Sequence, residues 1–116
     1  MDKEEWETLE LKFKHGGWAD HQDRNNELLC PQCDFNYLHI VKVIVARRTD
    51  DITVEKDRVE IREGGSPTRG NVIAMEYVGE CRHHGLIIFN FHKGNVHVWH
   101  KKLAEPRGAP QDIFRD

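Results

Sequence analysis

The chain of 116 residues contains only three cysteines, and no apolar run approaches the roughly 20 residues of a membrane-spanning helix. Its longest apolar stretch, residues 40–46, is interrupted by Lys42. The N-terminus, residues 1–5, is acidic and offers no apolar signal segment. We therefore expect a cytoplasmic protein that does not associate with membranes.

Long helical periodicity, internal repeats and a second apolar block are also missing from the sequence. With 38% hydrophobic and 32% charged residues, the chain can build one small core, which a metal or a disulfide commonly reinforces. We expect a single domain over residues 1–103. The tail, residues 104–116, contains Pro106, Gly108 and Pro110 and is expected to be flexible.

Catalytic motifs are scarce. There is no His-Glu-x-x-His, and Cys81 lacks the His-x-Glu partner of the zinc deaminases. Gly16-Gly17 and Gly64-Gly65 lack the Lys-Ser/Thr of a phosphate-binding loop, so we interpret both as turns. We expect that the protein is not an enzyme.

Strand patterns dominate the sequence. Residues 8–14 alternate between apolar and polar side chains, which is typical of a half-buried strand, and residues 37–47 are rich in β-branched residues on both faces. Residues 52–61 predict a hairpin around Lys56-Asp57, and residues 86–99 predict another around Lys93-Gly94. With a further strand at 72–78, the sequence predicts a mainly β fold with an antiparallel sheet.

The cysteines are the most informative residues. Three of them cannot all pair internally, and Cys30 and Cys33 are too close for an ordinary structural disulfide. In a reducing compartment, Cys-x-x-Cys near other cysteine and histidine residues indicates metal or redox chemistry. A redox motif would be followed by a helix, whereas residues 34–37 lead into a predicted strand. The pattern therefore favours a metal.

A second pair of candidate ligands follows in Cys81-Arg82-His83-His84-Gly85. Zinc prefers four tetrahedral Cys and His ligands in structural sites. Each pair of ligands with the short turn between them forms a zinc knuckle, here at residues 30–33 and 81–84. The two knuckles have the same spacing between their ligands if His84 is the fourth ligand, so we predict one structural zinc on Cys30, Cys33, Cys81 and His84. His83 is the competing ligand, and His39 could also reach the site.

Forty-seven residues separate Cys33 from Cys81, more than the roughly 15–20 of a compact ribbon. The predicted strand and hairpin fill that interval, so the sequence predicts a small zinc ribbon with an inserted β-hairpin.

The knuckles, together with Tyr37-Leu38-His39, the segment His92 to Val96 and Trp99, resemble a group of small uncharacterised zinc-ribbon proteins of bacteria, phages and prophages. The resemblance covers residues 30–100 and implies a phage or mobile-element origin without an established activity. The chain departs from this group at two positions. The second pair has His84 where the group has a cysteine, and Asp34 stands where knuckles often have glycine.

The closing hairpin offers a candidate binding surface. Its register gives one side an apolar set, Ile87, Phe89, Phe91, Val96 and Val98, and the other side a mixed set, Leu86, Ile88, Asn90, His92, His97 and Trp99. From the mixed side we predict Trp99, His97, Ile88 and Asn90 as partner-binding residues. Alternatively, the N-terminal strand covers this side, or it is a homodimer face.

The charge distribution allows two kinds of macromolecular partner. The formal net charge is −3, which argues against a general nucleic-acid binder, but residues 79–102 carry a net charge of +3. We expect a protein partner, supplied by the host of a phage; the alternative is a nucleic acid bound by the basic C-terminal half.

Overall fold

The computed structural model describes residues 3–15, 26–108 and 111–114. These residues form β1 (Glu7–Thr8), β2 (Phe13–His15), β3 (Asn26–Leu28), β4 (Leu38–Ala46), β5 (Asp50–Glu55), β6 (Arg58–Glu63), β7 (Asn71–Gly79), β8 (His84–His92) and β9 (Asn95–Leu103). The predicted mainly β, antiparallel, single-domain fold is confirmed. Within the described ranges, no helix is long and apolar enough to cross a membrane.

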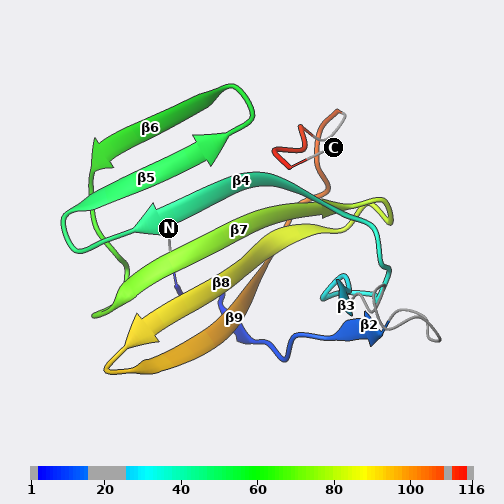
Figure 1. The fold of residues 1–116 in the computed structure, drawn as a ribbon, viewed down its shortest axis with the longest axis horizontal. Helices are drawn as coiled ribbons and strands as arrows, with labels where there is room; N and C mark the ends of the chain where they lie inside the picture. Colours follow the sequence, from blue (N-terminus) through cyan, green and yellow to red (C-terminus); the bar gives the residue numbers. More distant parts are fainter. Residues whose placement is uncertain (1–2, 16–25, 109–110, 115–116) are drawn as a thin grey trace.

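Seven strands form one antiparallel sheet in the order β1-β9-β8-β7-β4-β5-β6, and β2 pairs with β3 separately. Figure 1 shows β2 and β3 at one end of this sheet, far from β5 and β6 at its opposite edge. The strand predicted at 37–47 corresponds to β4, which lies inside the sheet between β7 and β5 as expected.

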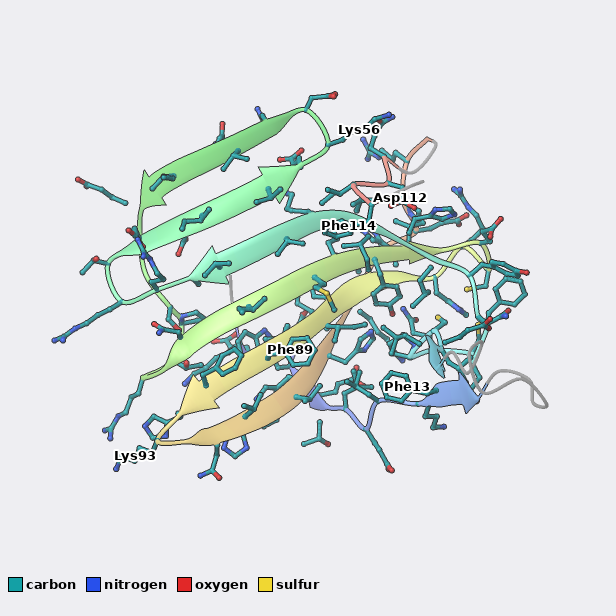
Figure 2. All side chains as sticks on the ribbon, in the orientation of Figure 1. Phe13, Lys56, Phe89, Lys93, Asp112 and Phe114 are labelled. Atoms are coloured by element: carbon teal, nitrogen blue, oxygen red, sulfur yellow. The ribbon has the colours of Figure 1, made fainter. Side chains whose placement is uncertain are left out.

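Both predicted hairpins have the predicted register. Ile52 lies opposite Ile61 and Val54 opposite Val59 in the β5–β6 hairpin. In the β8–β9 hairpin, Ile88 lies opposite Trp99. Its turn residues Lys93 and Gly94 both have positive φ, of 50° and 82°, which matches the right-handed twist of the two strands. Lys56 and Lys93 mark the tips of the two hairpins in Figure 2.

The sheet has an apolar cluster on each face. On one face, Trp6, Ile44, Trp99 and Leu103 pack against the buried cluster of Ala46, Val72, Ala74, Leu86 and Ile88. On the other face, the buried cluster consists of Cys30, Tyr77 and Ile87. Segments that precede β4 cover this second cluster through Leu9, Leu11 and Leu28. The sheet therefore carries the metal-ligand segment of residues 30–33 on one of its two faces.

Two terminal segments differ from expectation. The strand predicted over 8–14 is divided into β1 and β2, because β1 pairs with β9 whereas β2 pairs with β3. The tail is attached to the sheet: the Ile113 N–H donates to the Ile40 carbonyl at 2.9 Å, and His39 Nδ1 lies 2.9 Å from an Asp112 carboxylate oxygen. Figure 1 shows this segment beside the first half of β4, which β5 leaves unpaired.

Candidate metal centre

Three cysteines and one histidine converge at one end of the sheet. The ligand atoms of Cys30, Cys33, Cys81 and His83 all lie within 4.8 Å of one another. The Sγ atoms of Cys30 and Cys81 are 3.7 Å apart, and Cys30 Sγ lies 3.8 Å from His83 Nδ1. Such a cluster can hold one metal ion.

These separations fit zinc. With Zn–S bonds of about 2.3 Å and a Zn–N bond of about 2.0 Å, tetrahedral geometry separates two sulfur ligands by about 3.8 Å and sulfur from nitrogen by about 3.5 Å. The observed 3.7 Å and 3.8 Å are close to these values. Thiolate and imidazole are also the donors that structural zinc prefers. The residues present therefore fit a zinc ion.

The first knuckle is held by its own backbone. The Cys30 carbonyl accepts hydrogen bonds from the N–H groups of Cys33 and Asp34, at 3.3 and 2.9 Å, and the Cys30 N–H donates to the Phe35 carbonyl. This tight turn brings the two thiols of the Cys-x-x-Cys motif to one point. Asp34 closes it with a φ of 65°, in the region that favours glycine.

The second knuckle is the turn between β7 and β8. The Arg82 N–H donates to the Gly79 carbonyl, and the Gly79 N–H donates to the His83 carbonyl, both at 2.8 Å. A Cβ atom at Gly79 would lie 2.5 Å from Cys81 Sγ, so a side chain at this position would displace that sulfur. The turn thus places Cys81 and His83 beside the first knuckle.

The fourth potential ligand in the cluster is His83 and not the predicted His84, so the expectation of equal spacing in the two ligand pairs is corrected. His84 is the first residue of β8, on the same face as Leu86, whereas Cys30 packs with Tyr77 and Ile87 on the opposite face.

Both ring nitrogens of His84 have other neighbours: Nδ1 lies 2.7 Å from the Ala104 carbonyl oxygen, and Nε2 lies 3.2 Å from a Glu76 carboxylate oxygen. His39, the other alternative, is paired with Asp112.

The surroundings act differently on two of the thiols. Cys30 is fully buried, and this burial raises the pKa of its thiol to about 12, because an isolated thiolate loses hydration there. Burial acts on Cys81 too, but the hydrogen bond from the His83 N–H and the neighbouring thiols outweigh it and hold its pKa below the ordinary value. A positive ion would compensate the buried charge of the Cys30 thiolate.

A polar network behind the ligands joins the two knuckles. The Gln32 side-chain amide donates to the Tyr77 hydroxyl at 2.9 Å and to the His84 carbonyl at 3.0 Å. The Tyr77 hydroxyl in turn lies 2.7 Å from Nε2 of the buried His100. This network could not be predicted from the sequence because its members lie on four segments: the first knuckle, β7, β8 and β9. The amide side chain of Gln32, between the two cysteines of Cys-Pro-Gln-Cys, was its only local signal.

The predicted partner-binding residues are only partly brought to the surface. Ile88 is fully buried and Asn90 is only 9% exposed, so neither side chain forms an exposed surface. The cover is Trp6, whose ring centroid lies 6.5 Å from that of Trp99, and not the segment Leu9–Phe13 considered as the alternative. His97 is exposed and Trp99 is half-buried.

Trp99 and Asn90 nevertheless border a cavity of about 320 Å³, together with Lys3, Trp6 and Thr68. The Asn90 side chain is fixed there, since its Nδ2 donates to Thr68 Oγ1 at 2.8 Å and to the Asn71 carbonyl at 3.3 Å. The indole N–H of Trp6 is buried without a hydrogen-bond acceptor among the described residues. The sequence analysis missed Trp6 because it precedes the strand pattern on which the covering segment was predicted.

Comparisons of the chain with models of protein families, with curated proteins and with solved structures found no match.

Proposed function

We propose that the protein is a small zinc-ribbon-like binding module in which one structural zinc ion ties the N-terminal segment to the sheet. The convergence of Cys30, Cys33, Cys81 and His83 within 4.8 Å carries this proposal. Four protein ligands complete a tetrahedral shell, whereas catalytic zinc sites keep a position for water or substrate. The proposed role of the metal is therefore to stabilise the fold, and we propose that the protein is not an enzyme.

The proposed activity is binding of another protein through the Trp6–Trp99 cavity. A volume of about 320 Å³ is large enough for one or two side chains of a partner, and tryptophan, which lines this cavity twice, is enriched among the residues that dominate interface energetics. The partner is proposed to be a host protein of a bacterium, in keeping with the resemblance to phage and prophage proteins. The proposed location is the cytoplasm.

Nucleic acid is the weaker candidate. Two of the four cations that make residues 79–102 basic have acidic neighbours: Arg82 Nε lies 3.1 Å from Glu105, and Lys101 Nζ lies 4.0 Å from Glu5. These neighbours reduce the positive potential available to phosphate groups.

Affinity capture from a bacterial lysate, with and without nuclease treatment, tests the binding proposal. The zinc-loaded protein is compared with Trp99→Phe and Lys3→Glu, which alter the cavity, and with Lys93→Glu, which changes the same kind of charge at the distant β8–β9 turn. A host protein retained by the wild type and Lys93→Glu, but lost from both cavity variants, supports the proposal. Equal retention by all four proteins contradicts the assigned surface, and binding that disappears with nuclease points to nucleic acid.

A further inference from the structure

The face of the sheet that carries the metal centre continues as an apolar surface toward β6. Residues directly opposite each other in antiparallel strands share a face, so the register identifies an unbroken row across six strands. The row consists of Val98, Phe89, Ile73, Val45, Ile52 and Ile61. A second row, Met75, Val43, Val54 and Val59, runs beside it, and on the other side of the first row lie Phe91 and Val96, at β8 and β9. We call these residues the open face.

Covering segments reach only one end of this face. Leu9, Leu11 and Leu28 pack on the cluster around Cys30 and Ile87, and Figure 1 shows β2 and β3 away from β5 and β6. At the other end, Val59 and Ile61 are 64% and 69% exposed, while Phe91 and Val96 are 38% and 52% exposed. Among the described residues, these side chains continue a buried core without a second layer over them.

We propose that the open face of one chain packs against the open face of a second copy, so that the protein is a homodimer with a β-sandwich at its centre. A sheet with an apolar face requires a second layer to bury it, and two sheets meet this need by packing face to face. Twofold symmetry brings the same surface patch from both copies together.

The composition of the open face favours a second copy over an unrelated protein. Three charged residues of β6, Arg58, Glu60 and Arg62, lie on the opposite face, where Arg62 lies 2.8 Å from Glu60. The fourth, Glu63, lies opposite Asp50 and shares the open face only at its rim. At the rim, Arg47 and Asp50 neutralise each other through hydrogen bonds of 2.7 and 2.6 Å. Interfaces between identical chains are the most apolar class, and they need no charged recognition groups at their core.

The size of the open face is also adequate. A residue occupies about 33 Å² of a sheet face, given the spacing between strands and along each strand, so the open face covers roughly 400 Å² before the relief of its side chains is counted. Patches above a few hundred Å² are uncommon on monomers and typically mark interfaces. The uneven surface of the side chains and the residues at the rim add to the area that would be buried, toward the roughly 800 Å² per partner of a stable complex.

Light scattering coupled to size exclusion, applied to the full zinc-loaded chain over a range of concentrations, tests the proposal. The wild type is expected at twice the 13.6 kDa of one chain. Ile61→Glu, which places a carboxylate on the open face, is expected at the mass of one chain, with unchanged zinc content and circular dichroism. The matched control is Arg62→Glu, adjacent in β6 but on the opposite face, which is expected to remain dimeric although it changes the net charge more.

A monomeric wild type would overturn the proposal. Dissociation of both variants to the same extent would also overturn it, because the dimer contact would then lie at the β6 edge or depend on net charge alone. Should Ile61→Glu fail to fold, wild-type protein decides the question. In a mixture of isotope-labelled and unlabelled chains, intermolecular nuclear Overhauser effects between valine and isoleucine methyl groups of the open face are expected. Their absence in a dimer places the contact elsewhere and contradicts the proposal.

Discussion

The Sγ atoms of Cys30 and Cys81 lie 3.7 Å apart, although 51 positions separate the two residues in the chain. Between them the chain builds β4, β5, β6 and β7, so this one contact closes a loop around more than half of the sheet. A metal that closes a long loop removes conformational freedom from the unfolded chain and thereby stabilises the native one. The proposed zinc centre thus connects the segment that precedes β4 to the turn between β7 and β8.

The choice between the two adjacent histidines is directly testable. Replacing His83 with alanine removes one of four ligands, and we expect zinc affinity to fall at least roughly 100-fold, because water is a poorer ligand than imidazole. His84→Ala leaves the four ligands in place and loses the contacts with Ala104 and Glu76, for a stability cost of about 1 kcal/mol. Competition with a chromophoric zinc chelator measures both affinities. A larger loss for His84→Ala would restore His84 as the ligand.

Gly79 gives a test that removes no ligand. In Gly79→Ala, the new methyl group would overlap Cys81 Sγ, which lies 2.5 Å from the position of its carbon. We expect Cys81 to be displaced, with a loss of zinc affinity of about 10-fold or more. Gly94→Ala is the control: its Cβ meets no atom within 4 Å, and its positive φ costs about 1 kcal/mol at a distant turn. Equal zinc affinity for Gly79→Ala and the wild type would show that Cys81 is not held in this position.

Asp34 predicts a stabilising substitution. Its φ of 65° disfavours a side chain, so Asp34→Gly is expected to raise the free energy of unfolding by about 0.5–1 kcal/mol in the zinc-loaded protein, as measured by denaturant titration. Arg82 has a similar φ of 70°, but its guanidinium lies 3.1 Å from Glu105 and donates to the Pro106 carbonyl. The gain for Arg82→Gly is therefore expected to be smaller. The opposite order would contradict this account of the two turns.

Sequence patterns were sufficient for much of the sheet. In β5 and β6, the register that places Ile52 opposite Ile61 also pairs the polar residues of the other face, so the sequence pattern allowed few alternative registers. The cysteine spacing likewise identified three of the four ligands in the cluster. These features are local, or they depend on chemistry that only a few residue types supply.

Other features depend on contacts that no local pattern contains. His83 lies beside the cysteines, and His84 does not, because the turn that starts at Gly79 ends at His83 and β8 begins at His84. A shift of one residue would place the neighbouring side chain on that face instead. Trp6 covers one face because β1 pairs with β9, and the tail attaches because β5 leaves the start of β4 unpaired. The open face emerges only from the strand order, which places β7 between β8 and β4.

The most direct test of the central claim is metal analysis combined with unfolding in a chelator. We expect about one zinc per purified chain, and removal of the metal should cost on the order of 10 kcal/mol, enough to unfold a small domain. Cys30→Ser and Cys81→Ser should reproduce the effect of the chelator. A protein that contains no zinc and keeps its circular dichroism and denaturation midpoint in chelator would contradict the proposed metal centre.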